Sequence, residues 1–200
     1  MKILFLEDRP SRQTQFFPNK EKDVEKLKSM SELFLPQALE CKEIIAQINN
    51  KSFQFDLSLK LIIAHKSALT TEGLAYLNEI CKEKGIKLIC FSGGTSQVIF
   101  NKDDFEFLNI NSSDFYSDRL IPFLEKVARD EENNLLEIIN SQWELSYMLL
   151  ARQIMGSIDL EEDEDSKYRL KRKLEQIKMM INIYDEDLLS KEISKKLLTI

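Results

Sequence analysis

The chain has 200 residues, of which 43% are hydrophobic and 31% are charged, and this balance excludes both a disordered and a collagen-like protein. Its length suits one domain of ordinary size with an appendage. The formal net charge of −6 argues against nucleic acid as the main partner, because binding to phosphates requires a basic surface.

The chain starts with a short apolar run, Lys2–Leu6, which has the length of a buried parallel strand. This run passes directly into Glu7, Asp8 and Arg9, unlike a signal peptide. No stretch of the sequence approaches the roughly 20 apolar residues that a membrane-spanning helix requires. We therefore expect a cytoplasmic protein that does not bind membranes.

Further apolar runs alternate with helical patterns along the next part of the chain. The apolar runs cover 60–64, 86–91 and 105–110, and the helical patterns cover 36–49, 70–84 and 118–129. Gly85 follows the second helical pattern as a typical C-terminal cap. One more strand, the second along the chain, is expected near 26–30. Strands that alternate with helices predict an α/β domain over 1–130, with an open parallel sheet and helices on both faces.

After residue 130 the strand signal disappears, and the sequence predicts a C-terminal α-helical hairpin over 131–200. Apolar residues from Leu135 to Ile154 predict a first long helix that ends near Gly156. The second helix is expected after the acidic run 161–165, because carboxylates stabilise the positive end of a helix dipole. Apolar residues of this second helix alternate in steps of four and three, the spacing of a helix–helix contact. They are Leu170, Leu174, Ile177, Ile181, Tyr184 and Leu188.

Two helices alone cannot cover the apolar stripe of each member, whereas two hairpins together would form a four-helix bundle. We therefore expect the six residues of this seam to form the interface of a homodimer or a docking surface for another protein. The alternative is that the hairpin packs against the α/β domain and the protein is a monomer. A DNA-binding helix-turn-helix after residue 130 does not fit two long helices with an acidic linker.

Ligands of an open parallel sheet bind beyond the carboxyl ends of its strands. The polar residues expected there are Glu7 and Asp8, His65 and Ser92. The start MKILFLED with its acidic pair, the (βα)5 order and Ser92 followed by two glycines resemble the receiver domain of response regulators. This resemblance covers about 1–130 and implies a CheY-like, flavodoxin-like fold in which the acidic pair holds magnesium.

The resemblance also implies that this receiver is degenerate. Receivers carry a glycine eight residues after the phosphate-accepting aspartate, and Gly73 therefore puts His65 at the acceptor position. The lysine that the family has after its last strand is missing as well. Phosphoryl transfer needs a carboxylate nucleophile and cations beside the phosphoryl oxygens, so we expect it to fail here. Magnesium at Glu7 and Asp8 would lack the family's third carboxylate ligand, so a weak site or none is expected, and no other cofactor.

His65 has three interpretations. The first is a structural imidazole bonded to Glu7 or Asp8, whose protonated ring replaces the charge of the metal. The second is a phosphohistidine. The third is a small-ligand or catalytic role, because LEDRP and a histidine after the third strand also resemble receiver-like domains proposed to process cyclic phosphates. Those domains have an Asp-His-Asp run where this chain has Ala64, His65 and Lys66.

Two functional hypotheses follow from these observations. The leading one is a phosphorylation-independent pseudo-receiver, a response-regulator-like protein of signal transduction that acts through protein–protein interaction and has no catalytic residue. The alternative is a receiver-like hydrolase or phosphoesterase that acts on a cyclic phosphate or nucleotide at the pocket of Glu7, Asp8 and His65.

Overall fold

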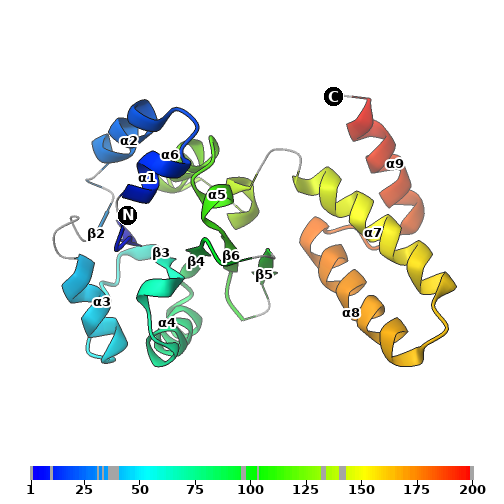
Figure 1. Cartoon of the computed structure of the whole chain (residues 1–200), viewed down its shortest axis with the longest axis horizontal. Coiled ribbons are helices and arrows are strands. Elements are labelled where there is room, and N and C mark those ends of the chain that lie inside the picture. The colour runs from blue at the N-terminus through cyan, green and yellow to red at the C-terminus, as the bar shows by residue number, and fades with distance from the viewer. Residues whose placement is uncertain are drawn as a thin grey trace. The chain divides into compact units, whose positions relative to one another are not determined.

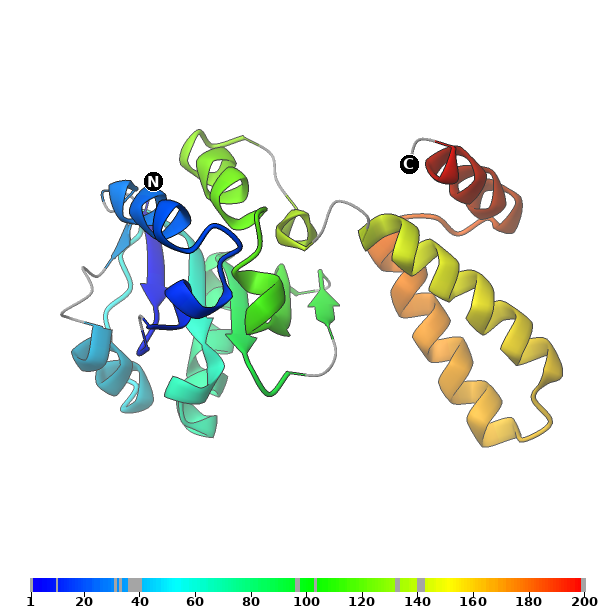
Figure 2. The ribbon, with the colours of Figure 1, turned by 45° about the horizontal axis from the view of Figure 1, so that its top comes forward.

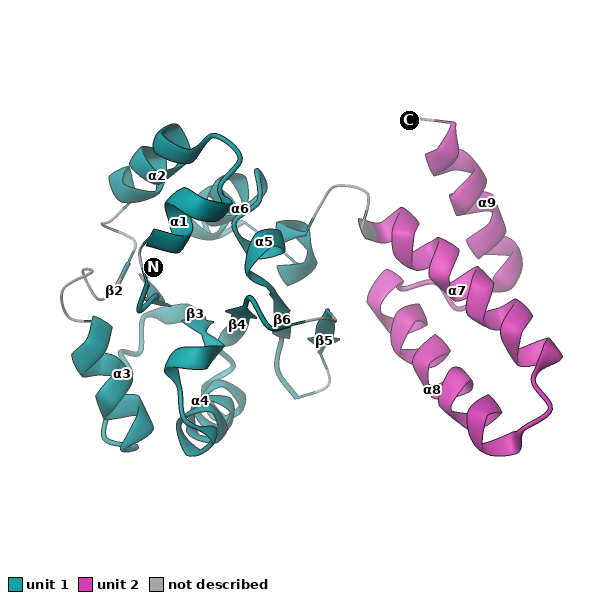
Figure 3. Ribbon diagram, viewed as in Figure 1, with its two compact units in different colours: residues 1–140 teal, residues 141–200 magenta. Residues whose placement is uncertain are grey.

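The computed structural model describes residues 2–9, 11–30, 32, 34–35, 41–95, 98–102, 104–131, 134–139 and 143–198. The chain divides into two compact units, Met1–Asn140 and Ser141–Ile200 (Figure 3). The division falls after residue 140 rather than after residue 130, where the sequence analysis puts it. A 3₁₀ helix, Leu135–Ile138, accounts for the difference, because three of its four side chains are buried and the Ser117 hydroxyl donates to the Ile138 carbonyl.

The first unit is built on a six-stranded sheet with the order β2-β1-β3-β4-β6-β5 (Figure 1). Its strands are β1 Lys2–Leu6, β2 Phe34–Leu35, β3 Leu59–His65, β4 Lys87–Ser92, β5 Ile99–Asn101 and β6 Phe107–Asn111. All neighbours are parallel except β5, which pairs antiparallel with β6. The first unit is thus an α/β fold with a mostly parallel sheet, as predicted, and is compatible with a flavodoxin-like fold.

Helices cover both faces of this sheet, as Figures 1 and 2 show. One face carries α1 Ser11–Phe16, α2 Lys20–Ser29 and α6 Leu120–Ala128, and the other carries α3 Cys41–Asn49 and α4 Thr71–Lys84. A short helix, α5 Ser112–Phe115, follows β6 directly. Burial on both faces explains why the strands are continuous apolar runs, since every residue of β3 except Lys60 is buried.

The second strand is not where the sequence analysis predicts it. Residues 26–30 belong mainly to α2, which buries Val24 and Leu27, and β2 follows at Phe34–Leu35. Val24 and Leu27 are three residues apart, a spacing that places two side chains on one face of a helix and on opposite faces of a strand. The prediction of a strand at 26–30 was therefore wrong.

The connection between β4 and β6 also departs from the (βα)5 order. A (βα)5 order implies a helix in this connection, although no helical pattern is predicted there from the sequence, and its described part contains the three-residue strand β5. Among the described helices, only α3 and α4 cover the face of the sheet opposite to α1, α2 and α6 (Figure 1). The neighbouring surface of β4 and β6 is therefore lined by loops and by β5.

The second unit contains three described helices, α7 Trp143–Leu160, α8 Glu164–Ile181 and α9 Glu186–Leu197, instead of the two that the sequence analysis predicts. The predicted seam is interrupted because Asn182 ends α8 in a left-handed conformation, with φ of 53°. Asp185 then begins α9 as an N-cap whose side chain accepts the Leu188 N–H at 2.7 Å.

The third helix covers the apolar surface that a two-helix hairpin would leave exposed. Leu174 and Ile177 of the predicted seam are buried in one core with Leu189 and Ile193 of α9. Leu170 and Ile181 are partly buried against this core, whereas Tyr184 and Leu188 are 57% and 44% exposed. A second copy is therefore not required to cover the whole seam. None of the described helices of the protein is long and apolar enough to cross a membrane.

Candidate functional site

Parallel pairing brings the carboxyl ends of β1, β3 and β4 to one edge of the sheet. Leu6 pairs with Ala64, and His65 pairs with Phe91, so the residues that follow β1 lie beside the end of β3. Glu7 and His65 are buried, and Asp8 is partly exposed. One ligand atom from each of these three residues lies within 4.8 Å of the other two.

His65 is the centre of a row of three hydrogen-bonded side chains. Its Nδ1 is bonded to Oδ1 of Asp8, and its Nε2 is bonded to Nη1 of Arg12, which extends from α1. A guanidinium carries only donors, so Nε2 is the acceptor and the ring proton lies on Nδ1, which donates to Asp8. This arrangement fits a neutral imidazole and not the protonated ring that the sequence analysis expects. Arg12 supplies the positive charge.

The imidazole of His65 has no solvent-exposed surface, and its ring packs against Phe91 with 5.5 Å between centroids. Because both ring nitrogens are bonded and buried, neither is free to receive a phosphoryl group. The phosphohistidine interpretation therefore requires Arg12 or Asp8 to leave the ring.

Glu7 is held beneath this row by two donors. The Tyr116 hydroxyl donates to Oε2 at 2.6 Å, and the Arg9 N–H donates to Oε1 at 2.8 Å. Burial raises the pKa of Glu7 above its usual value, although these two hydrogen bonds oppose the shift. Tyr116 is fully buried, and burial together with the Glu7 charge raises the pKa of its hydroxyl. The pair is therefore a structural hydrogen bond in the core at neutral pH.

Glu7, Asp8 and His65 are residue types that bind metals, and their carboxylate and imidazole groups suit a transition metal better than magnesium. However, the two nitrogens of His65 already face Asp8 and Arg12. A metal bound at either nitrogen would have to displace one of these partners, and a cation near Nε2 would be repelled by the guanidinium. The guanidinium of Arg12 thus occupies the position at Nε2 that a metal ion would need.

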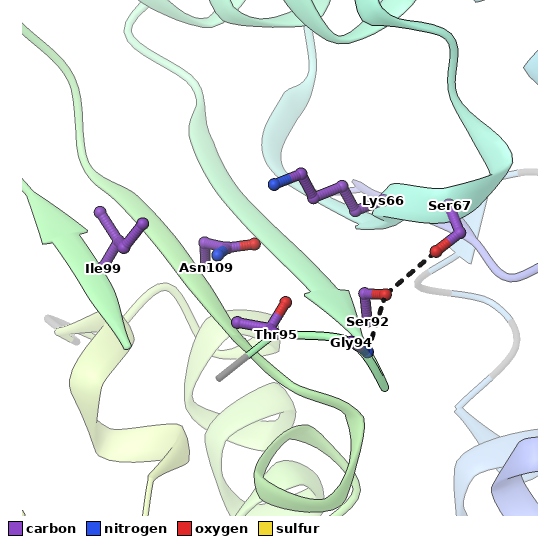
Figure 4. A pocket seen from close by; sticks show the side chains of 7 residues that line it. All are labelled: Lys66, Ser67, Ser92, Gly94, Thr95, Ile99 and Asn109. Carbon is purple, nitrogen blue, oxygen red and sulfur yellow. Dashed lines mark hydrogen bonds between the residues drawn. The ribbon is translucent and has the colours of Figure 1, made fainter. Parts of the chain in front are cut away.

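Ser92, the fourth predicted residue, belongs to different surroundings. Successive side chains of a strand point to opposite faces, so Ser92 faces away from its neighbour Phe91, which packs on His65. Its hydroxyl is 3.0 Å from the Ser67 hydroxyl and accepts the Gly94 N–H at 3.4 Å (Figure 4). Ser92 therefore lines a pocket apart from this cluster, beside Lys66 and Asn109.

Two residues of the site, Arg12 and Tyr116, are not among the residues that the sequence analysis selects. Arg12 follows Asp8 by four residues, so a nearby cation was a signal available in the sequence. Tyr116 meets Glu7 across 109 residues, and no local pattern indicates such a contact.

Comparisons of the chain with protein-family models, with curated proteins and with solved structures gave no match. The function of this site is therefore inferred from its geometry. Its described residues form a largely buried cluster in which each carboxylate and each imidazole nitrogen has a protein partner.

Proposed function

We propose that the protein is a cytoplasmic pseudo-receiver, a receiver-like signalling protein that acts through protein–protein interaction without phosphorylation of an aspartate. The observation that carries this proposal is the row of Asp8, His65 and Arg12 at the carboxyl ends of β1 and β3. A receiver would need an open carboxylate at the position of His65, together with a metal ion. This protein has a buried imidazole there and an arginine beside the acidic residues.

The arginine also gives a physical reason for a permanently unphosphorylated state. Its positive charge lies near the Asp8 carboxylate, so no magnesium ion is needed to offset that carboxylate. Arg12 lies on α1, so the cluster also ties this helix to the sheet. The proposed receiver likeness is supported by the parallel strand order β2-β1-β3-β4-β6.

We assign partner binding, as homodimerisation or docking, to the exposed surface of the second unit. Of the six seam residues, Tyr184 and Leu188 are the two that keep large exposed surfaces. Tyr168 and Met179 of α8 are also exposed, and their spacing of three helical turns puts them on one face of that helix. These side chains are available to a partner without disturbing the core of the unit.

The test of phosphorylation independence is intact-mass analysis after incubation of the full chain with acetyl phosphate and magnesium. A phosphate-accepting receiver domain, treated in parallel, serves as the positive control. We expect no adduct on this protein. An adduct of one phosphoryl group would contradict the proposal, and an adduct that is lost in acid but stable in base would identify phosphohistidine.

The alternative function is hydrolysis of a cyclic phosphate or nucleotide at the pocket of Glu7, Asp8 and His65. One observation favours it: Asp8 holds His65 in the tautomer whose Nε2 can accept a proton, as the base of many hydrolases does. Arg12 would then leave Nε2 and bind the phosphate. Turnover of cyclic nucleotides that is lost in both His65→Gln and Asp8→Asn would support the hydrolase and contradict the pseudo-receiver. Absence of turnover with magnesium, manganese or zinc would exclude it for these substrates.

A further inference from the structure

A polar pocket lies on the face of the sheet that carries α4. Cys90 of β4 belongs to the core under α3 and α4, and Asn109 of β6 is its partner in the parallel register, so Asn109 points to the same face. Above Asn109 is a pocket with a volume of about 510 Å³. Its walls come from Lys66 and Ser67 after β3, from Ser92, Gly94 and Thr95 after β4, and from Ile99 of β5 (Figure 4). It lies beside the β4–β6 connection, whose described part contains β5 rather than the helix of a (βα)5 order.

The floor of this pocket has an unmet hydrogen bond. Asn109 is only 4% exposed, and its Oδ1 accepts no hydrogen bond from any residue that the structure describes. Buried polar atoms of folded proteins are nearly always paired, so such an atom requires an explanation. A half-turn of the carboxamide exchanges Oδ1 and Nδ2 in place, and the side chain can thus offer an acceptor or donors to a molecule in the pocket.

The walls of the pocket supply donors and a positive charge. The hydroxyls of Ser67 and Ser92 are 3.0 Å apart and share one proton between them, so the second hydroxyl proton of the pair remains for another acceptor. Lys66 is exposed and makes no ion pair with a described residue. Figure 4 shows its ammonium and the Asn109 carboxamide directed into the same hollow.

The turn after β4 is held in place by the end of β6. The Asn111 side chain donates from Nδ2 to the carbonyls of Thr95 at 2.8 Å and Gly93 at 3.3 Å. Its Oδ1 in turn accepts the Ser113 N–H and caps α5. The wall that carries Ser92 and Thr95 is therefore fixed before any ligand arrives, which lowers the entropic cost of binding.

We propose that this pocket binds a small phosphate monoester of the size of a nucleoside monophosphate. Lys66 and the free serine proton would bind the phosphoryl oxygens, since a phosphate offers more acceptor oxygens than a carboxylate and a lysine is a common point-charge partner for it. Asn109 would bond a donor on the organic part, and Ile99, which is 52% exposed, would contact its apolar surface. The volume lies in the range of small-molecule sites. The site stands independently of the proposed function, because it uses none of Glu7, Asp8 and His65.

The test is calorimetric and NMR titration of the full chain with nucleoside monophosphates, with the corresponding nucleosides and with inorganic phosphate. We expect at least one monophosphate to bind, its nucleoside to bind about tenfold or more weakly, and the side-chain amide signals of Asn109 to shift on binding. Equal binding of nucleoside and monophosphate, or tighter binding of inorganic phosphate than of every monophosphate, would overturn the proposal. So would the absence of any binding.

Two variants locate the site. Lys66→Ala should weaken binding about tenfold, whereas Lys60→Ala, an exposed lysine near the opposite end of β3, should leave it unchanged. Asn109→Leu should abolish the interaction with the organic part with little effect on the melting temperature, because the buried Oδ1 that it removes has no described partner. If Lys66→Ala binds the monophosphate as tightly as the unmodified protein, the anion is not held in this pocket and the proposal fails.

Discussion

The guanidinium of Arg12 donates a hydrogen bond to Nε2 of His65, an imidazole with no exposed surface. The contact joins α1 to the carboxyl end of β3 and puts a permanent positive charge beside two acidic side chains. It also determines the proton position on the ring, because a donor at Nε2 leaves Nδ1 as the protonated nitrogen. A single contact thus decides the charge and the tautomer of the only histidine in the chain.

The tautomer of His65 can be measured directly. We predict that ¹⁵N chemical shifts of the single histidine in the folded protein at neutral pH are those of a neutral ring protonated at Nδ1. Nitrogen shifts distinguish this form from the Nε2–H tautomer and from imidazolium. An imidazolium pattern would mean that the ring, and not Arg12, supplies the cation, and our account of the cluster would be wrong.

Arg12→Ala should destabilise the first unit. The substitution leaves a buried ring nitrogen without its partner, and we expect the free energy of unfolding to fall by about 1–3 kcal/mol. Arg9→Ala is a matched control, because Arg9 is largely exposed and its ion pair with Asp8 is a surface contact worth about 0–1 kcal/mol.

The same variant tests whether Arg12 closes a metal site. With the guanidinium gone, Glu7, Asp8 and His65 form an open donor set, so zinc should restore part of the lost stability in Arg12→Ala and leave the unmodified protein unchanged. Urea unfolding with and without zinc gives the change in the free energy of unfolding for each of the two proteins. Equal zinc effects on the two proteins would contradict the closure of the site by arginine.

Glu7 should make the stability of the fold depend on pH. Because burial raises its pKa above the usual value of 4.5, the folded protein holds this proton more tightly than the unfolded chain. The resulting stabilisation is full below the unfolded pKa and is lost as pH rises through the folded pKa. Glu7→Gln cannot lose a proton, so its stability relative to the unmodified protein should increase between about pH 4 and about pH 7. Urea unfolding at both pH values measures the change, and Glu79→Gln on the exposed side of α4 provides the control.

Gly73 is required by packing between α3 and α4. A Cβ at this position would lie 2.2 Å from the side-chain oxygen of Asn49 and 3.1 Å from its Cα. That same oxygen accepts the Thr70 N–H at 2.9 Å, just before α4 begins, so it cannot move away freely. We predict that Gly73→Ala lowers the free energy of unfolding by about 1–3 kcal/mol.

The control for this substitution is Gly156→Ala in α7, where a Cβ would meet no atom within 4 Å. An alanine in an open helical position should stabilise its unit by about 0.5–1 kcal/mol. Thermal unfolding of the two variants should therefore shift in opposite directions. If Gly73→Ala leaves the free energy of unfolding unchanged, the Asn49 side chain moves to make room for the added methyl group.

The elements with strong local patterns were predictable. The strands β1, β3 and β4 are mainly apolar runs because both of their faces are largely buried, and β6 is a weaker run that Asn109 interrupts. The helix α4 was predictable at both ends, since Thr70 accepts the Gly73 N–H as its N-cap and Gly85 ends it with φ of 63°. Four polar residues at strand ends could also be selected, of which Glu7, Asp8 and His65 come together. Ser92 instead lines another pocket, because it points to the other face of the sheet.

Short elements and long-range partners were not predictable. The strands β2 and β5 have two and three residues, too few to show a period. The break between α8 and α9 is hidden because Tyr184 and Leu188 continue the spacing of the seam, and Asn182 and Asp185 are the only signals of an end and a start. The contact of Tyr116 with Glu7 depends on how the whole sheet folds.

The last prediction separates the core of the second unit from its surface. Leu174 is 7% exposed and packs in the three-helix core, so Leu174→Ala should lower the free energy of unfolding of this unit by about 2–5 kcal/mol. Tyr184 is 57% exposed, and Tyr184→Ala should change this free energy by no more than about 0.5 kcal/mol. If the second unit pairs with another copy through its exposed side chains, the double variant Tyr184→Ala, Leu188→Ala should reduce the mass measured by light scattering while thermal unfolding of the diluted protein is unchanged. If instead Leu174→Ala dissociates a dimer and leaves the helices as stable as before, Leu174 lies in an interface between copies and the three-helix core described for this unit is wrong.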